Sequence, residues 1–237
     1  MVGEGRRLLG LAGEQGIPVR LLGGVAVRLH AEDVPASLQR ECKDLDLVAP
    51  RGSSKSVSGL LRESGYEPHV AFNAMNGRER LLFLDEQHGR QVDVFVRSFR
   101  MCHEIPLEDR LTVDEDTVPL AELLLTKLQI IELNEKDVRD TVALLLEHEV
   151  TDDDAGVNGA RIAALCANDW GLWRTITANL ATVRAHADGY PGAARERVER
   201  GVDALLHRIE SAPKSRGWRL RAKVGDRKRW YETPEEV

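Results

Sequence analysis

Aromatic residues, cysteines and long apolar runs are all scarce in this chain of 237 residues. Aromatic residues make up 5% of it, and its three cysteines, Cys42, Cys102 and Cys166, stand far apart. An odd number of isolated cysteines indicates neither a disulfide framework nor a zinc site. No apolar run approaches the ~20 residues of a membrane-spanning helix, and the N-terminus has no signal-peptide core. These absences predict a cytoplasmic protein with reduced cysteines and no membrane partner.

An excess of positive charge is also missing, since the formal net charge is −6. This balance argues against a protein that coats nucleic acid non-specifically, although it is compatible with a local basic patch. Hydrophobic residues form 42% of the chain and charged residues 30%, which is an ordinary globular balance. The length suits one large domain or two modest ones.

The hydrophobic pattern predicts an α+β protein, with a small mixed sheet flanked by helices and followed by a helical C-terminal region. The expected helices of the first part cover 1–16, Val25–Ala31 and the stretch from Ser53 to Gly65. The expected strands are Pro18–Leu22, Asp44–Val48, Val70–Phe72, Arg80–Leu84 and Gln91–Val96, with turns at Asn76-Gly77 and at His88-Gly89. Further helices are expected over Leu120–Glu132, after a capping Asn134, and over 157–168, 169–188 and 193–211.

Three parts follow from this order: an α/β domain over 1–116, a helical domain over 117–212, and a basic, aromatic-containing tail over 213–237. Between Pro213 and Trp230 the tail has eight basic residues and one acidic residue, Asp226. One interpretation is a platform for a polyanion such as tRNA, with arginines on phosphates and Trp218 and Trp230 stacked on bases. The other is a solvated tail whose tryptophans pack on the preceding helices.

The stretch Leu21–Val48 carries the first chemical signal. Its Gly23-Gly24 pair opens a predicted helix, where bare N–H groups and the helix dipole suit a phosphate. Its end is Asp44-Leu45-Asp46 in a predicted strand, where side chains alternate between faces. Asp44 and Asp46 therefore project together and repel each other unless a cation or a hydrogen-bond network lies between them.

Asp93 is the second signal, because it interrupts the apolar strand Val92–Val96. A buried carboxylate there must be neutralised, hydrogen-bonded or bound to a metal. The alternative is an edge strand with Asp93 facing solvent. Together with Asp44 and Asp46, the pattern predicts three carboxylates on neighbouring strands that hold two Mg²⁺ ions against a triphosphate.

The order Gly23-Gly24, Asp44-x-Asp46 and Asp93 resembles the DNA polymerase β-like nucleotidyltransferase superfamily. The resemblance covers roughly residues 17–148, and Gly-Gly stands here in place of the commoner Gly-Ser. It implies that residues 1–116 form the nucleotidyltransferase domain, with the helical domain packed against its active site. It also implies that Gly23 and Gly24 bind phosphate, that Asp44, Asp46 and Asp93 bind metal, and that Asp93 is the base toward the acceptor hydroxyl.

A second match lies in Ala121–Leu146, which resembles the Lys-bearing helix and the Lys-Asp-x-x-Asp helix of AbiEii-type nucleotidyltransferases, including toxins of toxin–antitoxin systems. By this resemblance Lys127 reaches the nucleotide phosphates, while Asp137 and Asp140 line or brace the site. A lysine within an apolar helix face needs an anion or a route to solvent. Asp137 is also explained by a place in the first turn of a helix, and Asp140 by an ion pair on the helix surface.

The expected activity is therefore transfer of NMP from an NTP to an acceptor hydroxyl with Mg²⁺. The acceptor is open between tRNA or other RNA, a protein and a small molecule, and an antitoxin protein is a possible partner. The alternatives are an aminoglycoside- or lincosamide-type antibiotic nucleotidyltransferase and a non-catalytic nucleotide-binding relative.

Overall fold

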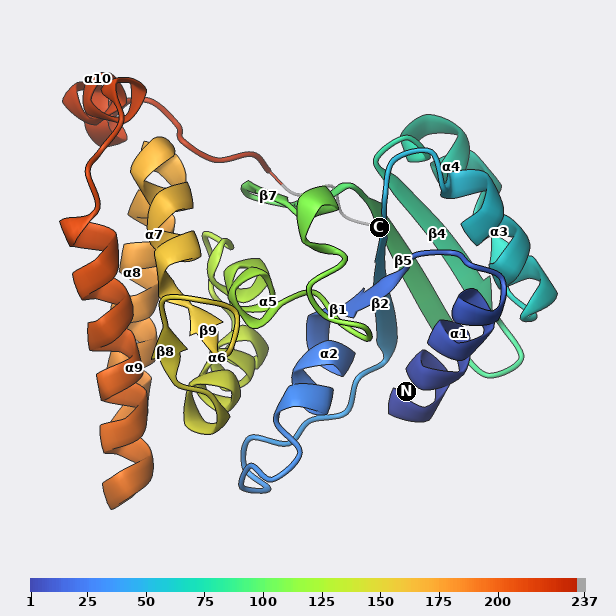
Figure 1. Ribbon diagram of the computed structural model, residues 1–237, viewed down its shortest axis with the longest axis horizontal. Helices are drawn as coiled ribbons and strands as arrows, with labels where there is room; N and C mark the ends of the chain where they lie inside the picture. Colours follow the sequence, from blue (N-terminus) through green and yellow to red (C-terminus); the bar gives the residue numbers. More distant parts are fainter. Residues whose placement is uncertain (234–237) are drawn as a thin grey trace. The chain divides into compact units, whose positions relative to one another are not determined.

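The computed structural model describes residues 1–233, and these form two compact units. The first unit contains Met1–Glu32, Gln39–Phe99 and Ile105–Pro119, and the second contains Asp33–Leu38, Arg100–Glu104 and the chain from Leu120 onward. The fold is α+β, as the sequence predicts: the first unit is built on a five-stranded mixed sheet, and the second is mainly helical (Figure 1).

The sheet of the first unit has the order β1-β2-β5-β4-β3. Its strands are β1 (Arg20–Leu22), β2 (Asp44–Ala49), β3 (Glu67–Pro68), β4 (Arg80–Asp85) and β5 (Arg90–Val96). The central pair, β2 and β5, is parallel, and the other neighbours are antiparallel. The predicted hairpin at His88-Gly89 is confirmed, since β4 and β5 pair as far as Asp85 and Arg90. This order places β2 and β5 side by side although about forty residues separate them in sequence.

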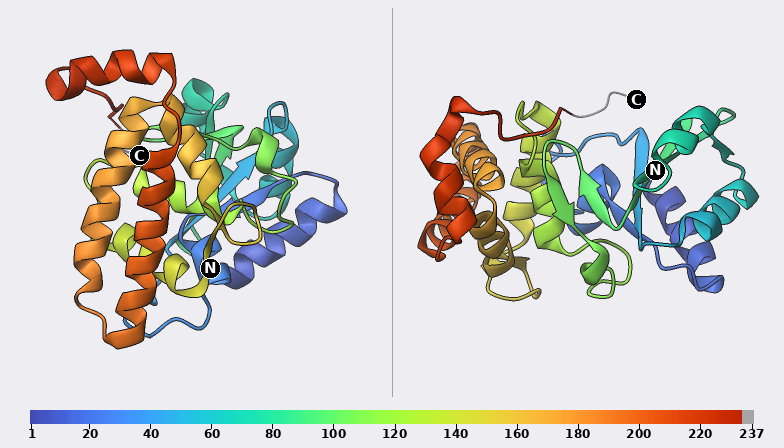
Figure 2. Two further views of the ribbon diagram at one scale, coloured as in Figure 1. Left: turned by 60° about the vertical axis from the view of Figure 1, so that its left-hand side comes forward. Right: turned by 90° about the horizontal axis from the view of Figure 1, so that it is seen from above.

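One face of this sheet forms the core of the first unit. The side chains of Leu21, Leu45 and Val92 point to this face and are completely buried. Helix α1 (Val2–Glu14) packs on this face at Gly5, where a Cβ would lie 3.2 Å from the Leu21 side chain. Helix α3 (Ser54–Glu63) packs beside α1 and buries Leu60 and Leu61 (Figure 2). The opposite face is left for the polar residues of β2 and β5.

One predicted strand, Val70–Phe72, is wrong: this segment begins helix α4 (Val70–Asn76). The His69 side chain caps the helix, because its Nδ1 accepts a hydrogen bond from the Phe72 backbone N–H at 3.2 Å. The Asn73 side chain then bonds both backbone groups of Leu82 on β4. Side chains thus take the place of a backbone ladder, and the strand β3 ends at Pro68.

The second unit contains most of the remaining helices. They are α5 (Leu120–Leu128), α6 (Glu135–Glu147), α7 (Gly159–Asn168), α8 (Trp170–Ala187), α9 (Gly192–Ser211) and α10 (Arg216–Val224). The predicted cap is confirmed, since the Asn134 side chain accepts from the Asp137 N–H. Helix α5 ends at Leu128, before the predicted Glu132, because the Asn179 amide bonds the Leu128 and Ile130 carbonyls in place of a further turn.

Short elements complete the chain. They are α2 (Gly23–His30) in the first unit, the strand pairs β6 (Ser98–Arg100) with β7 (Glu104–Pro106) and β8 (Val150–Thr151) with β9 (Val157–Asn158), and the 3₁₀ turns Glu108–Arg110 and Gly225–Arg227. Within residues 1–233, no helix has the length and apolar character needed to cross a membrane.

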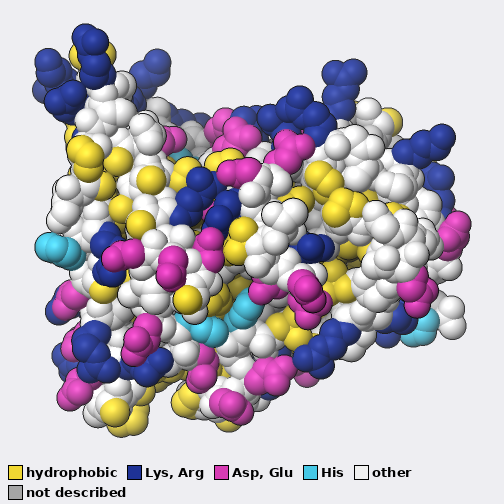
Figure 3. Space-filling view, viewed as in Figure 1, with side chains coloured by type: hydrophobic (Ala, Val, Ile, Leu, Met, Phe, Trp, Pro, Cys, Tyr) yellow, Lys and Arg dark blue, Asp and Glu magenta, His cyan; other side chains and the backbone are white. Residues whose placement is uncertain are grey.

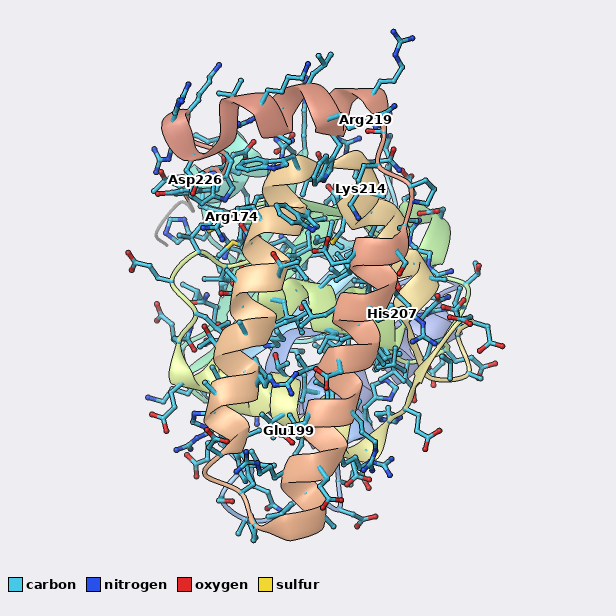
Figure 4. All side chains as sticks on the ribbon, turned by 90° about the vertical axis from the view of Figure 1, so that its left-hand side faces the viewer. Arg174, Glu199, His207, Lys214, Arg219 and Asp226 are labelled. Atoms are coloured by element: carbon cyan, nitrogen blue, oxygen red, sulfur yellow. The ribbon has the colours of Figure 1, made fainter. Side chains whose placement is uncertain are left out.

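The two tail tryptophans are packed against helices of their own unit. Trp218 meets Trp173 with ring centroids 5.2 Å apart, and Trp230 meets Trp170 at 6.1 Å. This packing agrees with the second interpretation of the tail, in which the tryptophans pack on the preceding helices, and both rings remain partly exposed. Basic side chains remain exposed over α10 (Figure 3), and Figure 4 shows Arg174 beside Asp226 below it. The last four residues of the predicted tail, 234–237, lie outside the described residues.

Candidate active site

The turn from β1 into α2 is shaped by Gly23. Its φ of 68° is a left-handed conformation that favours glycine. A Cβ at this position would also collide with the Asp46 carboxylate, whose Cγ lies 2.8 Å from where the Cβ would be. The contact follows from the register, because Leu22, the residue before Gly23, pairs with Asp46 across β1 and β2. The glycine therefore brings the start of α2 against one of the predicted metal ligands.

Gly24 lies against Arg40. A Cβ on Gly24 would be 3.0 Å from the Arg40 Cζ and 3.0 Å from the Cys42 Sγ. No side-chain hydrogen bond caps α2 at Leu22, and the first backbone N–H groups of a helix have no acceptor within the helix. Donor groups and a positive charge then occur together, which is an arrangement suited to phosphate oxygens. Sequence reasoning did not single out Arg40, because the loop that carries it has no periodic pattern.

The three aspartates occupy one face of the sheet. Asp46 and Asp93 are register partners on the parallel strands β2 and β5, and Asp44 pairs with Gln91. Asp44 is exposed, Asp46 is half-buried and Asp93 is 4% exposed. Since β5 lies between β2 and β4, the alternative of an edge strand with Asp93 in solvent is wrong.

Asp93 is held by two donors. Arg80 Nε donates to its Oδ1 at 2.8 Å, and Gln91 Nε2 donates to its Oδ2 at 3.0 Å. The Arg80 guanidinium itself lies 5.1 Å from the centroid of the Phe95 ring and 5.6 Å from that of Phe72. These contacts neutralise and hydrogen-bond the buried Asp93 carboxylate, as its place in an apolar strand requires. Arg80 precedes Asp93 by thirteen residues and becomes its neighbour only through the hairpin register.

The three aspartates are ligands of the type that Mg²⁺ requires. Carboxylate oxygens on adjacent strands are the hard ligands that this ion prefers, and the positions of Asp44, Asp46 and Asp93 meet that need. Within residues 1–233, however, no group of three acidic, histidine or cysteine side chains is arranged around a common point for a metal ion. The reason is visible at Asp93, whose two oxygens are engaged by Arg80 and Gln91. Metal binding by Asp44, Asp46 and Asp93 therefore stays a prediction.

The second unit brings Lys127, Asp137 and Asp140 together. Lys127 Nζ lies 2.8 Å from Asp140 Oδ2 and 3.7 Å from Asp137 Oδ1. Lys127 is 7% exposed and Asp140 is 4% exposed, so the pair is buried between α5 and α6. The lysine thus meets an anion, as its apolar helix requires, and the surface ion pair considered for Asp140 is replaced by this buried one.

Comparisons with known proteins relate the chain to nucleotidyltransferases. A family model described as "Uncharacterised nucleotidyltransferase" matches residues 1–169. Among solved structures, the chain is similar to the antibiotic-resistance factor ANT(2'')-Ia, at 11% identity over 60% of this chain and 80% of that one. The TM-score of that match is 0.42, which carries no argument about function. No curated protein matches the chain. On the family match, which covers well over half of its length, the chain belongs to this family of uncharacterised nucleotidyltransferases.

Proposed function

We propose that the first unit transfers a nucleoside monophosphate from an NTP to an acceptor hydroxyl, with RNA as the first acceptor to be tested. The observation that carries the proposal is the meeting of Gly23, Asp46 and Asp93. The glycine turn touches the Asp46 carboxylate, and Asp46 is the register partner of Asp93. A phosphate-binding helix start and two carboxylates are thereby held side by side by one sheet.

In the proposed reaction, the N–H groups at Gly23 and Gly24 and the Arg40 guanidinium hold the triphosphate oxygens. The acceptor oxygen attacks the α-phosphorus, the bond to the pyrophosphate oxygen breaks, and the hydroxyl proton passes to the Asp93 carboxylate. Arg80 orients Asp93 by its hydrogen bond. Asp44, Asp46 and Asp93 would hold Mg²⁺, which supplies positive charge to the triphosphate when it is bound.

The helical unit supports the AbiEii-type branch of the proposal through Lys127. The lysine lies next to Asp137 and Asp140, the other two residues that the resemblance singles out. RNA as acceptor is supported by the basic side chains of α10, where Arg216, Arg219 and Lys223 are exposed. Contacts between such side chains and phosphates provide most of the sequence-independent affinity for nucleic acid.

The experiment is a transfer assay with each α-³²P-labelled NTP, Mg²⁺ and total cellular RNA, followed by protein, aminoglycoside and lincosamide acceptors. Label should appear in RNA, should require the metal, and should fall at least a hundredfold in Asp46→Asn. Glu86→Gln is the matched control, because Glu86 is an exposed carboxylate in the β4–β5 turn of the same sheet.

Other results of this assay would support one of the alternative functions or contradict the assigned residues. Label in an aminoglycoside or lincosamide and not in RNA assigns the chain to antibiotic modification. NTP binding by calorimetry without label in any acceptor contradicts the transfer reaction and leaves a nucleotide-binding relative. Equal label with Asp46→Asn and with the wild type contradicts the assignment of the carboxylates.

A further inference from the structure

A second concave site lies in the first unit, away from the aspartates. It is a pocket of about 500 Å³ at the carboxyl ends of the parallel strands β2 and β5. The volume is within the usual range of ligand pockets, roughly 300–1,000 Å³. In open α/β sheets, ligands commonly bind at this edge. The lining residues are Arg51, Gly52, Ser54, Gly77, Arg78, Glu79, Val96 and Arg97.

The pocket is positively charged. Its lining contains three arginines, Arg51, Arg78 and Arg97, and one acidic residue, Glu79, which gives a formal charge of +2. The Glu108 carboxylate lies close by, since it accepts a hydrogen bond from the Arg51 backbone N–H at 3.1 Å. Counting Glu108 as well leaves the site at +1. The three arginines come from the segment after β2, the segment before β4 and the end of β5.

Arg97 is placed by an unusual backbone. Its φ is 64°, which makes it the one residue other than glycine with a positive φ within residues 1–233. The conformation is fixed from both sides: the Arg97 N–H donates to the Ala49 carbonyl at 2.8 Å, and its carbonyl accepts from the Leu107 N–H at 3.0 Å. Glycine and asparagine adopt this conformation at lower cost. The backbone of Arg97 is thus held in place at the end of β5, where the residue lines the pocket.

The pocket is distinct from the carboxylate face. Ala49 and Val96 follow Asp46 and Asp93 by three residues, so they lie about 10 Å further along the strands. An odd step also points their side chains to the opposite face of the sheet. That is the face on which α1 and α3 pack, and Ser54 at the start of α3 is part of the lining.

We infer that this pocket binds closely spaced phosphates, as in a polyphosphate or a nucleic-acid backbone, independently of nucleotidyl transfer. Planar guanidinium groups match phosphate oxygens in pairs, which favours this ligand over a monovalent anion. Among the eight lining residues, Val96 has the only hydrophobic side chain and none is aromatic. The site therefore offers charge to a ligand and no aromatic ring on which a base could stack.

The test is titration calorimetry of the full chain with inorganic pyrophosphate in EDTA at low salt. Arg78→Ala and Arg97→Asn remove one cation each, and asparagine keeps the left-handed backbone at residue 97. We expect each variant to weaken binding about tenfold, as for the loss of one charge-assisted contact. Arg62→Ala is the matched control, because Arg62 is an exposed arginine of α3 outside the lining. Loss of pyrophosphate binding in Arg78→Ala and Arg97→Asn with nucleotidyl transfer retained separates this site from the proposed reaction.

Absence of pyrophosphate binding by the wild type would overturn the inference. So would equal affinity in the wild type, Arg78→Ala and Arg97→Asn, or a loss as large in Arg62→Ala. A competition arm with a single-stranded RNA oligonucleotide identifies the source of the phosphates. Displacement of pyrophosphate by RNA in the wild type, and weaker displacement in Arg78→Ala, supports a backbone phosphate. Pyrophosphate binding that RNA does not displace supports a small polyphosphate.

Discussion

Asp46 and Asp93 are register partners on parallel strands, yet the Asp93 carboxylate is bonded to Arg80 and Gln91. A cation of the protein thus takes the place beside Asp93 that the proposed reaction gives to Mg²⁺. Arg80 is held there by the rings of Phe72 and Phe95 as well as by the ion pair. The two cations compete for one carboxylate, and this competition is measurable without any turnover.

Arg80→Gln should lower the free energy of unfolding by about 2–4 kcal/mol, because it leaves the buried Asp93 carboxylate without its cation. Mg²⁺ should raise the melting temperature of this variant more than that of the wild type, since the free carboxylate then accepts the ion. Thermal unfolding with and without 10 mM Mg²⁺, a concentration of the order used for weak sites, measures both. The control is Arg90→Gln on the neighbouring strand β5, which loses ion pairs to Glu4 and Asp85 and should gain no Mg²⁺ response. An equal Mg²⁺ response in all three proteins would contradict the competition.

Gly23→Ala should reduce stability and activity by more than the cost of a left-handed backbone conformation alone. Its matched control is Gly89→Ala, since the two glycines have φ values of 68° and 60°. Either change costs about 1 kcal/mol for the left-handed conformation. A Cβ at Gly23 also meets the Asp46 carboxylate, whereas a Cβ at Gly89 meets nothing within 4 Å. Urea unfolding and the transfer assay should therefore show a larger loss of stability and of activity for Gly23→Ala. Equal losses in both variants would show that the Asp46 contact has no consequence.

The position of the aspartates could be predicted from the sequence because it depends on local alternation. In a strand, Asp44 and Asp46 share a face whatever the rest of the chain does. Arg80 and Arg40 could not be found in this way, since each reaches its neighbour through strand register or a loop without a pattern. Helix α4 was missed for a related reason. The capping by His69 and the bonds from Asn73 to β4 are tertiary, and they outweigh the strand-like composition of Val70–Phe72.

The stability of the first unit should decrease in acid through Glu4. The hydrogen bonds from Arg7 are the main reason why the pKa of Glu4 is lowered to about 2, and those from Tyr66 add to it. A lowered pKa in the folded state gives stability that is present above pH 4.5 and is lost as the pH falls toward 2. Glu4→Gln should therefore cost about 1–2 kcal/mol at pH 7, after allowance for solvent screening, and less at pH 3.

Urea unfolding of both proteins at pH 7 and pH 3 measures this difference. Glu14→Gln is the control for the substitution itself, because Glu14 is an exposed residue near the end of the same helix. An effect of Glu4→Gln that stays constant between the two pH values would contradict the linkage.

The same contact acts at high pH, since burial and the Glu4 bond raise the pKa of Tyr66 to about 12. Stability from Tyr66 is thus complete below pH 10 and is lost as the pH rises toward 12.

The last prediction separates a structural from a nucleotide-binding Lys127. Lys127→Met should cost about 3 kcal/mol, because the buried Asp140 then lacks its cation. Replacing both partners, in Lys127→Met with Asp140→Leu, should recover most of this loss, since well-packed apolar residues replace a buried ion pair at little cost. Arg200→Met is the control, because its pair with Glu196 is exposed and should contribute less than about 0.5 kcal/mol.

The double variant is the informative protein, because it is folded and has no ammonium group at residue 127. If Lys127 contacts the nucleotide, transfer should fall at least tenfold in this variant, with a higher KM for the NTP and an unchanged melting temperature. A double variant with full activity would show that Lys127 acts only by neutralising Asp140 in the second unit. Asp140→Asn keeps the lysine and serves as the converse test: it should retain activity if the ammonium group itself is what the reaction needs.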